Sequence, residues 1–190
     1  MDNKKHLIGL ENGTYDLSTG TFREGRPDDR ITLCTGCIYP ADIEDNEVSE
    51  ELLNRKAGEI KEFIKQILPN KEIRDFAMTL LASFLDGNTN EEYFHVWTGS
   101  GGNGKSKLIE LFELAMGDYA CKLPITLLTG KRGSSSAASP ELAMLRGKRF
   151  ACLQEPDKGS KIEAGLMKEM TGGDTIYARD LFAKPFKFKP

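Results

Sequence analysis

The sequence predicts an α/β fold with a parallel sheet, preceded by a small domain of strands and helices. Three observations carry this prediction. A glycine-rich loop leads into a helical pattern at residues 99–116, an apolar segment with the form of a buried strand covers residues 150–153, and two amphipathic helical patterns lie between residues 50 and 85. The chain of 190 residues is long enough for one medium domain or two small ones.

The glycine-rich loop fits the phosphate-binding pattern G-x-x-x-x-G-K-[ST], the P-loop or Walker A loop, without a mismatch. Its glycines let the backbone adopt positive φ, so that successive N–H groups can surround phosphate oxygens. Lys105 supplies a charge for the β- and γ-phosphates, and Ser106 offers a hydroxyl to Mg²⁺. The residues predicted to bind the nucleotide are Gly99, Ser100, Gly101, Gly102, Asn103, Gly104, Lys105 and Ser106.

The flanks of this loop have the composition that a P-loop requires. Residues 93–98 are aromatic and β-branched, which predicts a strand before the loop. Apolar residues recur at helical spacing after it, and we expect them to pack the following helix onto a sheet; they are Leu108, Leu111, Phe112 and Ala115. The positive end of that helix dipole would then face the phosphates.

Residues 1–45 are predicted to form a β-hairpin region of short strands and tight turns. The candidate strands cover residues 7–10, 15–17 and 21–22, with turns at Asn12-Gly13 and at residues 18–20, and residues 30–33 are a further candidate. Residues 41–50 are acidic and poor in large apolar side chains, which indicates a linker or the start of a helix.

Residues 46–90 are predicted to form a helical module. Apolar residues repeat at helical spacing from Glu50 to Leu68, and Pro69-Asn70 ends this pattern. A second helical pattern runs over residues 73–85 and stops at Asp86-Gly87-Asn88. Both apolar faces are expected to pack in a core.

Residues 91–190 are predicted to form the core that carries the nucleotide site. Beyond the loop and its helix, residues 130–139 are rich in Gly and Ser and predict a mobile loop, and residues 140–145 predict a short helix with proline at its first position. Residues 150–153 are apolar throughout, as expected of a central parallel strand that is covered on both faces.

Glu155 follows this strand directly. Because α/β sheets present their ligand sites at the carboxyl ends of parallel strands, we expect Glu155 to orient Mg²⁺ and to polarise the water that attacks the γ-phosphate. Asp157 is a second candidate for this role. Gln154 stands where many ATPases place another acid, so magnesium binding would depend more on Ser106, phosphate and water.

Composition bounds the class of protein. The net charge is −3, with 11 Lys and Arg against 17 Asp and Glu in residues 1–90, and 15 against 12 in residues 91–190. No apolar run approaches 18 residues, and the polar N-terminus lacks the apolar region of a secretion signal, so we expect a cytoplasmic protein with no membrane span. Cys34 and Cys37 form a single C-x-x-C, and zinc would need two more ligands, so structural cysteines are the favoured interpretation.

The motifs together resemble the superfamily 3 helicases of the poxvirus-type and phage-type primase-helicase group. The resemblance is carried by the loop at residues 99–106, by residues 145–155, and by residues 168–179, which closely match the element K-x-x-T-G-G-D-x-I-x-A-R. Residues 10–17 and 27–32 resemble the module that precedes the helicase in these proteins, so the resemblance covers nearly the whole chain.

The resemblance implies an AAA+-like ATPase that assembles into a hexameric ring and moves along single-stranded DNA during viral, phage or plasmid replication. By the same resemblance, Lys105 and Ser106 hold phosphate and Mg²⁺, and Glu155 activates water. Residues 168–179 would lead to a hairpin that faces the channel, and the candidate DNA contacts are Lys168, Arg179 and Lys184. Ordinary edge-strand protection explains the lysines of this hairpin equally well.

The family pattern continues with a strand that ends in a phosphate-sensing Asn and with an arginine supplied to the neighbouring subunit. Neither precedes Pro190, so we expect a truncated core that binds nucleotide weakly or not at all and hydrolyses ATP negligibly. Two other classes stay open. One is a different P-loop enzyme, such as a nucleotide kinase or a GTPase, although no N/T-K-x-D base-reading motif is present. The other is a DNA-binding or assembly module that does not hydrolyse ATP.

Overall fold

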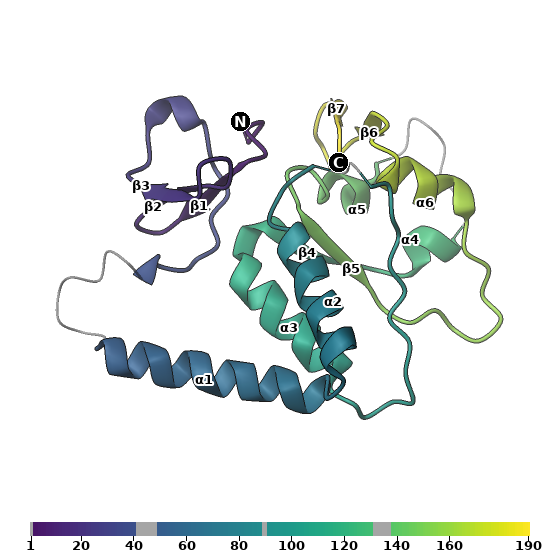
Figure 1. Cartoon of the computed structure of the whole chain (residues 1–190). Coiled ribbons are helices and arrows are strands. Elements are labelled where there is room, and N and C mark those ends of the chain that lie inside the picture. Colours follow the sequence, from purple (N-terminus) through teal and green to yellow (C-terminus); the bar gives the residue numbers. More distant parts are fainter. Residues whose placement is uncertain (1, 41–48, 89–90, 131–137) are drawn as a thin grey trace. The chain divides into compact units, whose positions relative to one another are not determined.

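A computed structural model describes residues 2–40, 49–88, 91–130 and 138–190 of the chain (Figure 1). Its contacts form two compact units: a first unit of residues 1–86 with 97–117, and a second unit of residues 87–96 with 118–190. The fold is mixed α/β and contains a parallel strand pair. The predicted division into residues 1–45, 46–90 and 91–190 stays a prediction.

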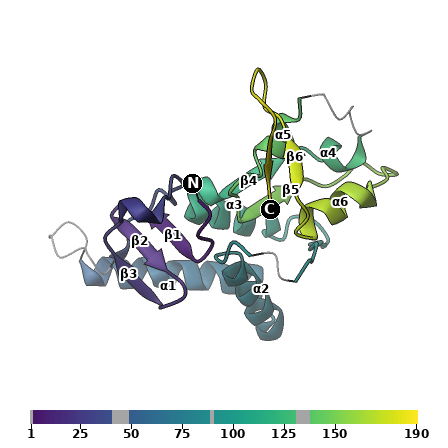
Figure 2. The same cartoon turned by 90° about the horizontal axis from the view of Figure 1, so that it is seen from above.

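The first unit begins with an antiparallel three-stranded sheet of order β1-β2-β3 (Figure 2). Its strands are β1 (Leu7–Leu10), β2 (Gly13–Asp16) and β3 (Thr21–Arg23), which confirms the predicted hairpin region. Gly13 lies in β2 rather than in the turn, and a Cβ atom there would come within 2.5 Å of the carbonyl oxygen of Arg23. The close approach of β3 therefore requires glycine at this position.

Residues 30–33 do not form the predicted strand. They follow the 3-10 helix η1 (Pro27–Asp29), and the carboxylate of Asp2 accepts hydrogen bonds from the backbone N–H groups of Thr32 and Leu33, at 2.6 and 3.2 Å. A side chain therefore occupies donors that a strand would offer to its neighbour. Further along, the N–H of Thr35 donates to the carbonyl of Gly9, which attaches this segment to the outer edge of β1.

Two helices follow, α1 (Glu50–Ile67) and α2 (Lys71–Ser83), as predicted. Each begins at a side-chain cap: the hydroxyl of Ser49 accepts from the N–H of Leu52, and the side-chain oxygen of Asn70 accepts from the N–H of Ile73. Helix α2 ends at Ser83, two residues before the end of the predicted range. The acidic residues 41–48, predicted as a linker or helix start, lie outside the described residues.

Helix α3 (Lys105–Met116) completes the first unit and starts directly after the glycine-rich loop. The helix was predicted, but its packing partner was not. Within its unit α3 packs on helices α1 and α2, not on a sheet: Leu108 is 2% exposed and lies in an apolar cluster with Ile64 and Leu81, and Phe112 packs against this cluster.

Residues 93–98 do not form the strand predicted before the loop; in the described chain they are assigned to no strand. β-propensity favours an extended chain, but a strand also needs a hydrogen-bonding neighbour. Trp97 packs instead against the apolar cluster around Leu108, and Phe94 packs in the core of the second unit.

The second unit contains the parallel strand pair, β4 (Ala120–Leu123) and β5 (Phe150–Leu153). Strand β5 was predicted, but as a central strand covered on both faces; in the described residues it pairs with β4 alone, and Ala151 is exposed. Its partner β4, which follows the 3-10 helix η3 (Gly117–Tyr119), was not predicted. Helices α4 (Thr126–Thr129), α5 (Pro140–Ala143) and α6 (Ala164–Thr171) accompany the pair. The predicted mobile loop at residues 130–139 falls largely on residues 131–137, which lie outside the described residues.

A separate antiparallel hairpin of β6 (Ile176–Ala178) and β7 (Phe186–Phe188) ends the chain. The core of the second unit is apolar and includes Cys121, Leu128 and Leu166, with Phe186 and Phe188 of the hairpin packed against it. None of the described helices is long and apolar enough to cross a lipid bilayer.

Candidate functional site: the glycine-rich loop and its companions

In the loop at residues 99–106, three glycines have left-handed backbone conformations. Gly101, Gly102 and Gly104 have φ of 78°, 61° and 80°, the left-handed conformations that glycine allows at no steric cost. Residues 99–103 are exposed, so their N–H groups are open to a ligand. This backbone agrees with the reason for expecting glycines in the sequence.

Lys105 folds back over this loop. Its Nζ donates a hydrogen bond to the Oδ1 of Asn103 at 2.8 Å. A Cβ atom on Gly99 would lie 2.5 Å from the Nδ2 of Asn103 and 2.6 Å from the Nζ of Lys105, so a larger residue would displace the ends of these two side chains. The ammonium group is therefore held on the loop that the sequence assigns to phosphate.

The helix that follows the loop adds a favourable field. Helix α3 has no acidic residue in its first turn, and its N-cap is Gly104, so no side chain neutralises the positive end of its dipole. Ser106, the predicted Mg²⁺ ligand, is exposed in this first turn. Loop, ammonium group and helix terminus together fit an oxyanion such as a nucleotide phosphate.

Glu155 lies where it was predicted, two residues beyond the carboxyl end of β5 in the second unit. Glu155, Gln154 and Asp157 are exposed. Since β5 is parallel to β4, this carboxylate is at the edge of the sheet where α/β proteins place ligand sites. The described residues contain no cluster of three or more His, Cys, Asp or Glu side chains that could hold a metal ion.

The three predicted DNA contacts belong to the second unit but to different elements. Lys168 is exposed on α6, and Lys184 is exposed in the segment that joins β6 to β7. Arg179 follows β6 directly and is half-buried; its backbone N–H donates to the hydroxyl of Ser139 at 3.3 Å, and its carbonyl accepts from the N–H of Ser139 at 2.8 Å. The backbone at the base of the hairpin is thus tied to the residue before α5.

The hairpin has two unlike faces. Ile176 and Ala178 pair with Phe188 and Phe186, and Ala178 and both phenylalanines take part in the apolar core. Tyr177 and Lys187, which lie directly opposite each other in the register, are both exposed. The outward face therefore presents an aromatic ring and a cation side by side.

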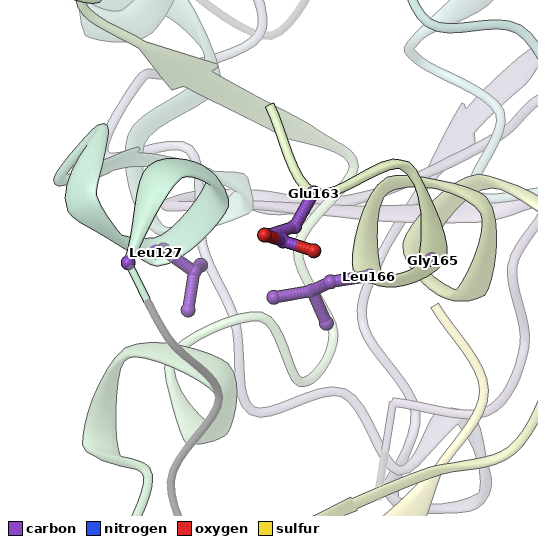
Figure 3. A pocket seen from close by; sticks show the side chains of 5 residues that line it. Leu127, Glu163, Gly165 and Leu166 are labelled. Atoms are coloured by element: carbon purple, nitrogen blue, oxygen red, sulfur yellow. The ribbon is translucent and has the colours of Figure 1, made fainter. Parts of the chain in front are cut away.

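A pocket of about 150 Å³ lies elsewhere in the second unit, between α4 and α6 (Figure 3). It is lined by Leu127, Gly130, Glu163, Gly165 and Leu166, and Figure 3 shows the carboxylate of Glu163 beside the two leucines. None of these five residues was predicted as a site residue, and no sequence motif marks them.

Sequence reasoning also missed the buried charge of the first unit. Asp29 is 4% exposed, and its carboxylate accepts two hydrogen bonds from Arg23, each 2.8 Å long, and one from the N–H of Arg26. The hydrogen bonds from Arg23 hold the pKa of Asp29 well below its usual range, although burial opposes them. The Pro27-Asp28-Asp29-Arg30 run was the only signal that could have pointed to it.

Comparison with known proteins agrees with this assembly of motifs. Residues 1–88 match the family described as "D5 N terminal like". The whole chain is 48% identical over 190 residues to "Putative helicase L207/L206" of Acanthamoeba polyphaga mimivirus, covering 19% of that protein.

Two further relatives come from other large DNA viruses. The chain is 34% identical over 186 residues, 97% of its length, to "Putative helicase 184R" of Invertebrate iridescent virus 6, covering 18% of that protein. It is 28% identical over 196 aligned residues, which take in its whole length, to "Putative primase C962R" of African swine fever virus, covering 19% of it. The chain spans about a fifth of the length of these curated relatives. The chain is thus similar to one segment of proteins that are named as putative helicases or primases of DNA viruses.

Proposed function

We propose that this chain carries the nucleotide-binding part of a viral replicative helicase of superfamily 3, with an AAA+-like P-loop core. The observation that carries the proposal is the loop at residues 99–106, where three glycines at positive φ and the ammonium group of Lys105 stand at the exposed start of α3. The names of the relatives support a role in DNA unwinding or priming.

In this proposal the loop binds the phosphates of ATP, Lys105 neutralises the β- and γ-phosphates, and Ser106 holds Mg²⁺. Bound Mg²⁺ would neutralise charge on the phosphates during transfer to water. Glu155 accepts a proton from that water, which is the role of a general base at the carboxyl end of a parallel strand.

The hairpin of β6 and β7 is the proposed contact with single-stranded DNA. Its outward face offers Tyr177 for stacking on bases and Lys187 for phosphate, and Lys184 adds a second cation in the connecting segment. Such a face makes no base-specific contacts, which suits a motor that moves along DNA of any sequence. Assembly into a hexameric ring around the strand belongs to the same proposal.

Nucleotide binding can be tested on the chain itself. Titration of ATP-Mg²⁺ to millimolar concentration into ¹⁵N-labelled protein should shift the amide resonances of Gly101, Gly102 and Gly104. Lys105→Ala should raise the apparent Kd at least tenfold, because a hydrogen bond to a charged group contributes about 1.5–3 kcal/mol and about 1.4 kcal/mol corresponds to tenfold. Lys107→Ala is the matched control, since Lys107 is exposed in the same helical turn and pairs with Glu110 at 2.8 Å.

Loop resonances that stay fixed in the wild-type chain, or a Lys105→Ala variant that binds as well as Lys107→Ala, would overturn the proposal. The same titration with GTP distinguishes the GTPase alternative. A GTPase would show a clear preference for guanine, whereas the helicase proposal expects ATP to bind at least as well.

Hydrolysis separates a motor from a module that only binds DNA. In a longer form of the protein that hydrolyses ATP, Glu155→Gln should lower kcat by about 10²–10⁴-fold, the usual contribution of a general base. Asp157→Asn tests the second candidate for this role in the same way, and Lys158→Ala is the control, because Lys158 is exposed three residues beyond Glu155. If turnover and strand separation survive Glu155→Gln, Glu155 is not the base.

A further inference from the structure

The phosphate-binding helix is fixed by a glycine contact at each end. At its start, Gly104 has φ of 80°, and a Cβ atom there would lie 2.7 Å from the Cγ1 of Ile67 at the end of α1. No larger residue fits between the loop and α1 without displacing one of them. The residue that follows is Lys105, so this contact sets where the ammonium group begins its path over the loop.

At the other end of α3, Gly117 contacts residues 34 and 35, which belong to the N-terminal part of the chain that precedes the helices (the N-terminal module, residues 2–40). Gly117 has φ of 50° and ψ of −123°, and a Cβ atom there would lie 2.2 Å from the carbonyl oxygen of Thr35 and 2.8 Å from that of Cys34. The contact is made by backbone on both sides, so a change of rotamer cannot relieve it. Gly117 therefore packs directly against the backbone carbonyl groups of Cys34 and Thr35, and a larger residue fits there only if the backbone moves.

The segment that Gly117 contacts is hydrogen-bonded to the edge of the N-terminal sheet. Thr35 is buried, its N–H donates to the carbonyl of Gly9 in β1 at 3.0 Å, and its hydroxyl accepts from the N–H of Cys37 at 3.2 Å. On the far side of the segment, the N–H of Glu11 donates to the carbonyl of Cys37. A displacement of Thr35 would therefore move the edge of the sheet with it.

Helix α3 connects the two contacts as a rigid rod. Its 12 residues correspond to about 18 Å at 1.5 Å per residue. Leu108 and Met116, near its two ends, are each 2% exposed, so rotation of the helix about its axis would expose apolar surface. A shift imposed at Thr35 is therefore transmitted to the start of the helix instead of being absorbed along it.

We infer that Gly117 is a positioning residue through which residues 34–37 of the N-terminal module set the position of the phosphate-binding loop. This inference rests on the proposed function, because it assigns a regulatory contact to the same nucleotide site. Coupling between two sites is reciprocal, so nucleotide bound at the loop must also be felt at residues 34–37. A partner that binds this segment would alter nucleotide affinity by the same factor.

The inference is tested by following both sites in one titration. ATP-Mg²⁺ added to the ¹⁵N-labelled chain should shift the amide resonances of the loop and of residues 34–37 with the same midpoint. In Gly117→Ala the response at residues 34–37 should disappear, and the midpoint at the loop should rise at least fivefold, the lower end of common coupling factors. The fold is checked by the dispersion of the remaining resonances.

Gly20→Ala is the matched control for backbone strain. Gly20 also has positive φ, 67°, in the first unit, but nothing lies within 4 Å of a Cβ atom there. This variant should keep both responses and the wild-type midpoint. A loss of coupling in Gly20→Ala equal to that in Gly117→Ala would show that strain, and not the contact with Thr35, is responsible, and would overturn the inference.

A measurement on the wild-type chain tests the coupling even if Gly117→Ala does not fold. Cys37 is exposed and lies two residues from Thr35, so its alkylation rate, followed by mass spectrometry, reports on this segment. The rate should change at least twofold on saturation with ATP-Mg²⁺, and Lys105→Ala should abolish that change.

The coupling to residues 34–37 and the nucleotide site can be disproved separately. If the loop resonances respond and both the amides of residues 34–37 and the Cys37 rate do not, the coupling is wrong and the nucleotide site stands. If the loop resonances themselves do not respond, the proposed function is wrong.

Discussion

The two units of this chain bury different kinds of residue. The buried polar residues of the described chain, Thr14, Asp29 and Thr35, all belong to the first unit, whereas the buried residues described in the second unit are hydrophobic. The first unit therefore combines buried hydrogen bonds, which fix loops and edges at defined positions, with an apolar cluster around Leu108. The second is held by apolar burial, which is less directional and does not depend on the charge of a side chain.

This difference matches what each unit is proposed to do. The first unit must hold a glycine-rich loop and a helix terminus in one geometry, and its polar anchors, close glycine contacts and the apolar cluster around Leu108 contribute to this. The second unit presents Glu155 and a hairpin from an apolar base. The following predictions test this contrast, from the largest expected effect to the smallest.

Leu128→Ala should destabilise the second unit by about 3 kcal/mol, because Leu128 is 0% exposed and truncation of a buried leucine leaves a cavity. The free energy of unfolding of this unit can be followed by denaturant-dependent alkylation of the buried Cys121. Ile162→Ala is the control, since Ile162 is exposed in the same unit. Equal losses in the two variants would show that the apolar cluster does not hold the unit together.

Asp29→Asn should destabilise the first unit by about 2 kcal/mol, because it weakens the charged hydrogen bonds from Arg23. The pKa of Asp29 is lowered in the folded state, so its contribution is fully present above about pH 4 and is lost as the pH falls toward the folded-state pKa. Fluorescence of Trp97, the single tryptophan, reports on this unit.

The dependence of the stability of the first unit on pH distinguishes the protonation of Asp29 beside Arg23 from general acid denaturation. Asp29→Asn should flatten the loss of stability below pH 4 in the first unit, while Asp28→Asn, a change at the exposed neighbour, should leave the profile as it is in the wild type. The second unit, read through Cys121, should show no such step. A step of the same size in both units would contradict the contrast between them.

Lys184→Ala combined with Lys187→Ala should weaken binding of single-stranded DNA roughly tenfold at moderate salt. The slope of log K against log salt should shrink by about 1.4, from about 0.7 for each lost phosphate contact. Lys158→Ala with Lys161→Ala is the control, because these lysines are exposed in the same unit but outside the hairpin. Fluorescence anisotropy with a labelled oligonucleotide measures both. An unchanged slope in the hairpin variant would remove these lysines from the DNA site.

Ser49→Ala should cost the first unit about 1 kcal/mol, because the hydroxyl of Ser49 caps α1 through the N–H of Leu52 at 3.2 Å. Ser49→Asp should restore the stability, since aspartate caps equally well. Chemical denaturation followed by Trp97 measures the change. If Ser49→Asp is as unstable as Ser49→Ala, the cap is not the source of the loss.

The two sides of the glycine-rich loop show how far the sequence could predict the fold. The helix after it was predicted correctly, because the spacing of Leu108, Phe112 and their neighbours is a local property of the chain. The prediction of a strand before the loop was wrong. Residues 93–98 have the composition of a strand, but pairing depends on which edge is free nearby, and no local pattern encodes that.

The candidate functional residues also divide into those that the sequence could predict and those that it could not. Lys105 and Glu155 could be selected from the sequence because their roles depend on fixed spacing to a loop or strand. Gly117 and Asp29 could not, because their partners, Thr35 and Arg23, have no periodic relation to them in the chain. Lys168, Arg179 and Lys184 were selected through a resemblance, and their role stays a prediction.

The sequence alone determined helices α1, α2, α3 and α5, the glycines of the loop and the apolar strand β5, since each depends on residues within a few positions of one another. Tertiary structure decided that α3 packs on α1 and α2, that β5 pairs with β4, and that Asp29 is buried beside Arg23. These outcomes depend on which distant surfaces exclude water together, and only the folded chain brings those surfaces into contact.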